Sequence, residues 1–233
     1  MIIELPVLPT KGVGKHYKMG FYHFSNNNLA IRKQCAQDLG MYDPEALTSE
    51  DVDLCFRLAL DSHWVACREP GVVIRHKARR TLRALLRQMW GWGIRLGRPY
   101  SKTGYRGFYA YRVSPKTHTI DFDLELGWVP GLACIFLTDF HFTHLLAGAG
   151  LVAWLAGSTA LGTAFLLAAG FTFWRYLADV RRIGLPLWST VKLAVIQYAA
   201  NLAFISASFV GGLRSGMLLI PASILPPRGA SEL

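Results

Sequence analysis

The spacing of apolar residues near the start of the chain predicts one short helix after an irregular segment. Residues 1–24 contain several prolines and glycines and read as irregular or extended. A helix is expected over residues 29–39, with Asn28 as its N-cap and Gly40 at its end. A loop over residues 41–47 follows.

A second helix is predicted to begin near Thr48 or Ser49. Thr48 and Asp51 have the spacing of a capping box. One apolar face follows at helical spacing, formed by Val52, Cys55, Phe56 and Ala59. Three acids, Glu50, Asp51 and Asp53, therefore lie at the N-terminal end of this helix.

Two short strands and a longer amphipathic helix come next. The strands are expected at residues 63–67 and 71–76, and the helix at residues 79–96. The helix has an apolar stripe at i, i+3, i+4 and i+7, formed by Leu82, Leu85, Leu86 and Met89.

The second half of the chain is dominated by apolar segments. Residues 126–142 are apolar but interrupted by polar residues, and we expect them to lie at a membrane interface. Residues 145–174 contain no charge, so they form either one very long helix or two short ones that turn near residues 157–159. Residues 187–213 form a last apolar segment, with a polar stripe of Thr190, Gln197, Asn201 and Ser208. This stripe either packs inside a bundle or faces lipid headgroups.

Composition and charge divide the chain in two. It has 233 residues, 52% of them hydrophobic, a net charge of +10 and a mean hydropathy of +0.27. This hydrophobicity excludes a disordered chain and is unusual for a soluble nucleic-acid binder. Residues 1–125 hold 19 of the 25 Lys and Arg. The pattern predicts a charged half joined to a membrane half, and because the start resembles no signal peptide, we expect the N-terminal half to be cytoplasmic.

The positive charge is concentrated in residues 75–116, which contain twelve basic residues and no acid, with Trp and Tyr between them. Such a run is typical of nucleic-acid binding or of the cytoplasmic membrane surface. The membrane interpretation is favoured because the apolar segments begin directly afterwards. Basic residues on both flanks of residues 145–174 favour two crossings there, and the choice between two and three spans in total stays open.

No cluster of Cys and His in the sequence has the spacing of a zinc site. Its four cysteines, Cys35, Cys55, Cys67 and Cys134, form no C-x-x-C pair and are expected to be reduced and buried. His141 and His144 share a helical face, and we interpret this pair as structural or interfacial.

The order of motifs between residues 24 and 97 resembles family 2 glycosyltransferases, which are inverting enzymes with a GT-A fold. The family pattern has an Asn-rich turn, A-x-R-[RK], a G-x-[FY]-D turn, E-D-x-D-L-x-x-R-L, a strand ending V-x-x-H, and a helix with Gln and Trp. The matching segments are Asn26–Asn28, Ala30–Lys33, Gly40–Asp43, Glu50–Leu58, Val73–His76 and Gln88–Trp92. They cover about a third of the chain.

The resemblance implies roles for particular residues. Asp51, in the E-D pair with Glu50, would be the base that takes a proton from the acceptor hydroxyl. The alternative is that these acids only favour a helix start, and Asp53 is also spaced to pair with Arg57. His76 would be a ligand of a divalent metal, Mg or Mn, that neutralises the nucleotide diphosphate.

Further residues would bind substrates by the same resemblance. Asn27 and Asn28 belong to the Asn-rich turn, and Gln88 and Trp92 match the family's Q-x-x-R-W motif, in which Gly91 here replaces Arg. This replacement favours a single transfer over polymer synthesis. The tryptophans are equally suited to stacking on sugars and to the membrane interface.

The first half of the family's catalytic domain has no counterpart in this sequence. Only about 25 residues precede the Asn-rich turn, and no βαβ unit ends in the D-x-D that would bind metal and nucleotide-sugar. We therefore expect an incomplete enzyme, inactive alone, with a missing N-terminal half as a possible partner.

The predicted fold class is α/β, a partial GT-A (Rossmann-like) half followed by a helical membrane region. Its regions are an acceptor-side part at 1–78, a basic interfacial helix and loop at 79–125, and membrane helices at 126–233. The predicted function is transfer of a sugar from a nucleotide-sugar to an envelope lipid or polysaccharide, with inversion, at the inner membrane. We expect a multi-pass protein of this membrane. The alternative is a non-enzymatic membrane protein or an inactive fragment whose basic face binds anionic lipid or a partner. Nucleic acid is not expected as a partner.

Overall fold

The computed structural model describes residues 29–46, 49–61, 64, 79–102, 106–113, 120–181 and 184–223. These residues form a mixed α/β structure that is mostly helical, with six helices and one four-stranded sheet. The elements in chain order are α2 (Lys33–Asp38), α3 (Glu50–Asp61), α4 (Leu82–Lys102), β1 (Gly107–Val113), β2 (Ile120–Leu126), β3 (Leu132–Leu137), α5 (Asp139–Leu155), α6 (Thr159–Arg181), α7 (Leu187–Arg214) and β4 (Leu218–Ile220).

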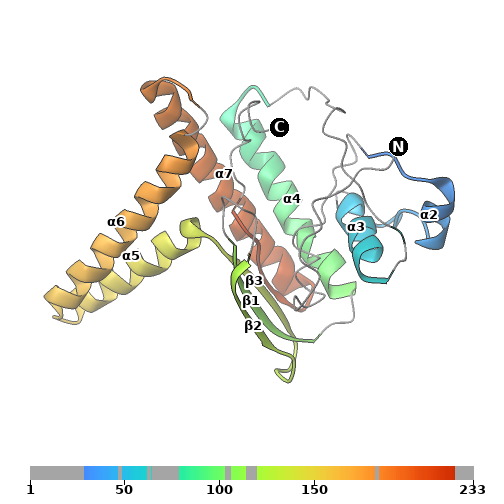
Figure 1. The fold of residues 1–233 in the computed structure, drawn as a ribbon, viewed down its shortest axis with the longest axis horizontal. Helices are drawn as coiled ribbons and strands as arrows, with labels where there is room; N and C mark the ends of the chain where they lie inside the picture. Colours follow the sequence, from blue (N-terminus) through green and yellow to red (C-terminus); the bar gives the residue numbers. More distant parts are fainter. Residues whose placement is uncertain are drawn as a thin grey trace.

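The sheet has the strand order β2-β1-β3-β4 (Figure 1). β1 pairs with β2 in antiparallel orientation and with β3 in parallel orientation. β4 pairs with β3 in parallel orientation, with Cys134 opposite Leu219. The pairing of β3 with β4 joins segments separated by the three apolar helices α5, α6 and α7.

The main core lies where α3, α4 and the sheet meet. Phe56 of α3 packs edge-on against Tyr100 of α4, with 4.7 Å between ring centroids. Tyr111 of β1 stacks on Phe136 of β3 at 5.4 Å. These side chains belong to one buried cluster, which also contains Leu219 of β4. The charged half and the end of the apolar half therefore share a single core.

The sequence prediction of a loop after α4 is wrong, because this part of the chain forms β1 and β2. Tyr109 and Tyr111 belong to the aromatic residues of the basic run at residues 75–116, which was expected at the membrane surface, and both are buried in the core. The Tyr111 hydroxyl donates to Glu125 Oε1 at 2.7 Å, and the Tyr109 hydroxyl donates to the carbonyl of Arg106 at 2.5 Å. The local signal that the basic charge obscures is in β2, where apolar and acidic residues alternate with a period of two from Ile120 to Leu126.

Residues 126–142 also differ from the interfacial segment that their composition predicts. β3 runs through them as a core strand with alternating burial, and α5 begins at Asp139. Asp139 itself is buried. The apolar character of this segment therefore reflects its place inside the sheet.

The helical predictions agree better with the structure. The uncharged segment forms two helices, α5 and α6, with a turn at residues 156–158, and Gly157 has φ +83° there. α7 matches the last predicted segment to within a residue. α4 begins later than predicted and continues to Lys102, and α2 has only six residues. The two strands predicted between residues 63 and 76, apart from residue 64, lie outside the described residues.

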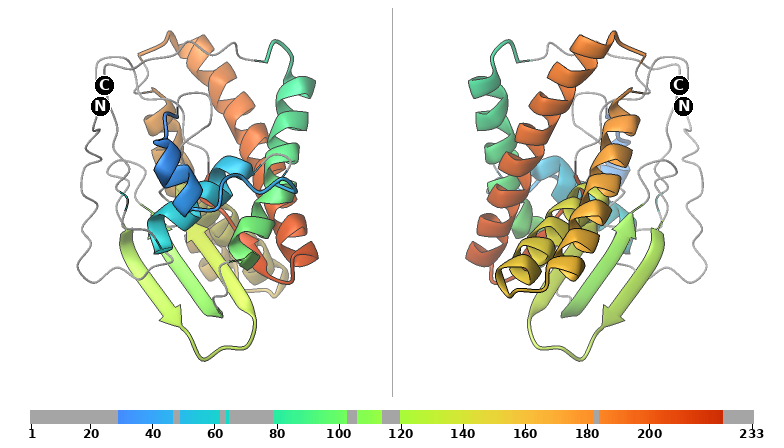
Figure 2. Two further views of the ribbon diagram at one scale, coloured as in Figure 1. Left: turned by 90° about the vertical axis from the view of Figure 1, so that its right-hand side faces the viewer. Right: turned by 90° about the vertical axis from the view of Figure 1, so that its left-hand side faces the viewer.

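The described helices fall into three groups. α2 and α3 lie on one side of α4, and α4 packs along α7 (Figures 1 and 2). The α5–α6 hairpin points away from the sheet and from the α4–α7 pair (Figure 1). α6 and α7 meet where the hairpin returns to the rest of the molecule.

Candidate functional site

The first turn of α3 carries the acids that the sequence analysis selected. Glu50, Asp51 and Asp53 all lie within it, where the helix dipole favours negative charge. Asp51 is half-buried, and its Oδ1 accepts the N–H of Val52 at 2.9 Å. The pKa of Tyr42 is raised, first by burial and then by the charges of Cys55, Asp51 and Glu50. The Tyr42 phenol therefore lies in the field of the same carboxylates.

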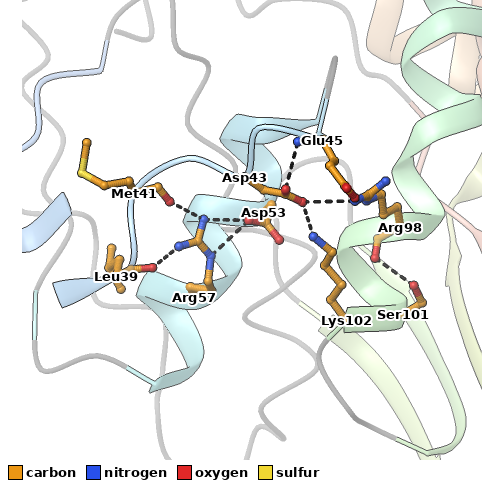
Figure 3. Close-up of polar contacts among 9 residues, drawn as sticks. All are labelled: Leu39, Met41, Asp43, Glu45, Asp53, Arg57, Arg98, Ser101 and Lys102. Atoms are coloured by element: carbon orange, nitrogen blue, oxygen red, sulfur yellow. Dashed lines mark hydrogen bonds and ion pairs between the residues drawn. The ribbon is translucent and has the colours of Figure 1, made fainter. Parts of the chain in front are cut away.

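Asp53 has a structural partner, as its spacing suggests. Arg57 donates to Asp53 Oδ2 from Nε at 3.1 Å and from Nη2 at 2.7 Å. The same guanidinium donates to the carbonyls of Leu39 and Met41, the second at 2.8 Å (Figure 3). Arg57 thus connects α3 to the turn that ends α2, and Asp53 positions this arginine.

A second group of ion pairs connects the same turn to α4. Asp43 Oδ2 pairs with Lys102 and lies 3.5 Å from Arg98 Nη2, and Glu45 also pairs with Arg98 (Figure 3). The Asp43 Oδ1 atom accepts the N–H of Glu45 at 3.0 Å. The hydrogen bond from Lys102, followed by that from Glu45, lowers the pKa of Asp43. The loop before α3 is therefore held from both sides, by Arg57 and by α4.

Sequence reasoning missed the partners on α4. Arg98 and Lys102 were assigned to the basic run that faces the membrane, yet both pair with the Asp43–Glu45 loop. Arg98 and Lys102 are four residues apart on α4, but their acidic partners lie in a loop much earlier in the chain. A search for i,i+4 ion pairs within one helix does not detect such contacts.

Gln88 and Trp92 lie on the N-terminal half of α4, apart from the acids. α3 meets α4 at Tyr100, which is about 12 Å further along the helix axis than Trp92. Gln88 Oε1 accepts a hydrogen bond from Arg79 Nε at 3.1 Å, and Trp92 is 45% exposed. The described contacts do not bring these two side chains together with Asp51.

The remaining predicted site residues cannot be placed. His76, Asn27 and Asn28 lie outside the described residues, as does Thr48 of the expected capping box. Within the described part of the chain, no group of three or more His, Cys, Asp or Glu could hold a metal ion. An open depression of about 430 Å³ lies at the end of α4, beside Arg106 and Met217, and none of the predicted site residues lines it.

The two histidines of α5 make structural contacts. His144 Nδ1 donates to the carbonyl of Phe140 at 2.7 Å, and its Nε2 lies 2.6 Å from the Tyr198 hydroxyl. His141 Nδ1 accepts the N–H of Thr138 at 3.1 Å. This agrees with the structural interpretation of the pair.

Two of the described helices are long and apolar enough to cross a membrane. The apolar windows are Thr159–Ala178 of α6 and Leu187–Arg214 of α7. The observation concerns length and composition, and it supports membrane association.

Comparison with known proteins leaves the function open. No family model, curated protein or solved structure matches the chain.

Proposed function

We propose that this chain is the acceptor-side and membrane-binding part of a family 2-like, inverting glycosyltransferase with a GT-A fold. The observation that carries the proposal is the arrangement around Asp51. Asp51 lies in the first turn of α3, and the loop that precedes this helix is held by Arg57 through Met41 and by Lys102 through Asp43. The order of motifs from the Asn-rich turn to Gln88–Trp92 supports the same function.

Asp51 would act as the general base. Its carboxylate takes the proton of an acceptor hydroxyl while that oxygen attacks the anomeric carbon of the sugar, and the nucleotide diphosphate leaves from the opposite face. The dipole of α3 favours the ionised carboxylate that this step needs. Glu50 would assist from the adjacent position, and Asp53 would hold the local structure through Arg57.

Further residues are proposed to bind the substrates and the metal. Gln88 and Trp92 would contact the acceptor, Asn27 and Asn28 would contact substrate, and His76 would contribute to a divalent metal site. When bound, the metal would neutralise the diphosphate of the leaving nucleotide. The described residues contain no complete ligand set, so this site requires His76 together with a D-x-D from a donor-binding partner polypeptide.

We also propose the location of this reaction. The acceptor is an envelope lipid or polysaccharide, and the enzyme acts at the cytoplasmic leaflet of the inner membrane, with its N-terminal half in the cytoplasm. The apolar helices α6 and α7 support membrane association. The concentration of basic residues between positions 75 and 116 supports the cytoplasmic side.

Reconstituted sugar transfer tests the proposal. The chain is co-expressed with a polypeptide that carries a βαβ unit and a D-x-D, and its membranes are supplied with labelled nucleotide-sugars and Mn²⁺ or Mg²⁺. Transfer should appear and should fall by about 10²-fold or more in Asp51→Asn. Asp38→Asn, a carboxylate change on α2, is the matched control and should retain transfer. Transfer that survives Asp51→Asn, or no transfer with any donor, contradicts the proposal.

A second candidate function is non-enzymatic binding of anionic lipid. It is favoured by the exposed residues Arg83, Arg87 and Trp90 on α4. Co-sedimentation with vesicles of phosphatidylglycerol and phosphatidylcholine, together with the transfer assay, separates the two. Lipid binding lost in Arg83→Gln/Arg87→Gln, in a chain that transfers no sugar, supports this second function.

A further inference from the structure

α7 has its polar side chains inside and its apolar side chains outside. Thr190, Asn201 and Ser208 are buried, so the polar stripe packs within the molecule. The opposite side exposes a stripe of large apolar residues along the whole helix, namely Leu187, Val191, Val195, Leu202, Phe209 and Leu213. This distribution is the reverse of that in a water-soluble helix, and it indicates that a lipid phase covers the exposed stripe.

The α5–α6 hairpin has the same character. No Asp, Glu, Lys or Arg occurs between Asp139 and Arg175. Several polar side chains in this region bond to partners inside the molecule: the Thr143 and Thr172 hydroxyls lie 2.9 Å apart, Trp154 Nε1 donates to the carbonyl of Thr159 at 3.2 Å, and His144 bonds to Tyr198 of α7. Internal pairing of this kind is what a hydrocarbon environment requires.

The two helices of the hairpin, α5 and α6, are held side by side, so both would reach the same depth in a membrane. At its base, Arg175 Nε lies 3.1 Å from Asp139 Oδ2, and Arg112 of β1 lies 3.9 Å from Asp139 Oδ1. Nearer the tip, a Cβ on Gly150 would lie 3.0 Å from the carbonyl oxygen of Gly162, so the backbones are in close contact. Because α5 and α6 are paired along their length, any membrane that one arm enters is entered by the other.

The pairing of β3 with β4 then restricts the topology. β3 immediately precedes α5, and β4 follows α7, so all three apolar helices lie between two hydrogen-bonded strands. Hydrogen-bonded strands of one sheet lie on the same side of a membrane, which makes the number of crossings between them even. α5 and α6 together contribute two crossings or none, and therefore α7 contributes none.

The packing of α7 supports this restriction. Gly93 and Gly97 of α4 face Ala207 and Gly211 of α7, so the two helices run parallel in close contact. α4 carries exposed arginines, and the turn after α7 leads to Met217 in the main core. The C-terminal half of α7 is thus attached to the charged part of the molecule, although its composition suits a membrane span.

We propose that the α5–α6 hairpin enters the bilayer from the side of the sheet, while α7 does not cross and lies along the membrane surface. Its apolar stripe contacts the acyl boundary of the leaflet that faces the sheet. Trp188 and Lys192, which are 5.3 Å apart in a cation–π contact near the start of α7, lie at the headgroups, where such residues are typical. This arrangement rests on the membrane location in the proposed function. It predicts two membrane spans, α5 and α6, and no third span by α7.

Cysteine accessibility at the two ends of α7 tests the inference. Leu185→Cys and Arg214→Cys mark the ends of α7, and Trp128→Cys marks the turn between β2 and β3. Each full-length variant is labelled with a membrane-impermeant maleimide in right-side-out and in inside-out vesicles. Labelling of the parent chain provides the background: its described cysteines, Cys35, Cys55 and Cys134, are buried, and Cys67 is present in every variant.

We expect all three positions to be labelled in the same vesicle orientation, by at least about fivefold over the other orientation. Labelling of Leu185→Cys and Arg214→Cys from opposite sides would overturn the inference. Extraction with carbonate shows whether a negative result contradicts the placement of α7 or the proposed membrane location. A chain released by carbonate contradicts membrane insertion itself, whereas a retained chain labelled on opposite sides contradicts only the placement of α7.

Discussion

At the scale of single residues, Arg57 organises the turn before the candidate site. Its guanidinium bonds to Asp53 and to the carbonyls of Leu39 and Met41, in a turn where Gly40 has φ +77° and Met41 has φ 61°. A left-handed conformation at a non-glycine residue costs free energy and needs support from its surroundings. The i,i+4 pairing of Asp53 with Arg57 was predictable from the sequence, but the two carbonyl partners depend on how α2 and α3 pack.

Removing the Arg57 side chain should destabilise the protein. We expect Arg57→Ala to lower the free energy of unfolding by about 2 kcal/mol, because buried Asp53 loses its cation and two carbonyls lose a charged donor. The measurement is urea unfolding in detergent micelles. Arg87→Ala, a change at an exposed arginine of α4, is the control and should shift stability by less than about 0.5 kcal/mol. Equal effects of the two changes would contradict this role.

The ion pair of Asp43 with Lys102 should make stability depend on pH. Because the folded state lowers the pKa of Asp43, the carboxylate stabilises the fold above its ordinary pKa of 3.8, and the contribution is lost as pH falls through the lowered value. Unfolding measured between about pH 6 and pH 2 should therefore show a smaller acid-induced loss in Lys102→Met than in the parent chain. Arg87→Met removes one positive charge elsewhere and should keep the parent's pH dependence. An unchanged profile in Lys102→Met would show that the pair does not contribute.

At the scale of elements, the different faces of α4 make different contacts. One face presents Gly93 and Gly97 to α7, another presents arginines to solvent, and its last turns bind the Asp43–Glu45 loop. The amphipathic period of α4 was predictable, and so was the G-x-x-x-G spacing of residues 93 and 97. The identity of its partner helix was not predictable, because the residues of α7 that contact α4 lie far from it in the sequence.

Glycine substitutions distinguish the packed face from the open face of α4. A Cβ on Gly97 would lie 2.8 Å from the Gly211 carbonyl oxygen and from the Gly212 Cα, so Gly97→Ala should destabilise by about 1 to 3 kcal/mol. A Cβ on Gly91 would have no atom within 4 Å, so Gly91→Ala should be neutral or stabilise by up to about 1 kcal/mol through helix propensity. Thermal unfolding in detergent measures both. A loss in Gly91→Ala equal to that in Gly97→Ala would contradict the close packing of α4 on α7.

At the scale of the whole molecule, the distribution of apolar surface separates a water-facing part from a lipid-facing part. Tyr111, Cys134 and Leu219 are buried in the core near the sheet, whereas Leu155 and Leu167 of the hairpin are 80% and 71% exposed. In water such a hairpin would expose a large apolar surface, whereas a bilayer would bury it.

A charge placed on the hairpin tests which solvent surrounds it. Leu167→Arg should reduce retention in carbonate-washed membranes, because an arginine near the centre of a membrane helix costs about 2.5 to 3.5 kcal/mol. Trp128→Arg changes an 81% exposed residue in the turn between β2 and β3 and should leave retention unchanged. If Leu167→Arg is retained as well as the parent chain, the hairpin does not enter lipid.

The sequence by itself determined the local elements and the division of charge in this protein. Helices α3 and α4 follow from apolar spacing, since residues three and four apart meet on one face of a helix, and the helices of the second half follow from long apolar segments with little or no charge. The acids at the start of α3 and the polar stripe of α7 were also visible. Only the tertiary structure decided that the stripe faces inward, that Arg98 and Lys102 bind the loop before α3, and that β4 returns to β3. These outcomes depend on contacts between residues far apart in sequence, and such contacts leave no periodic signal in either segment alone.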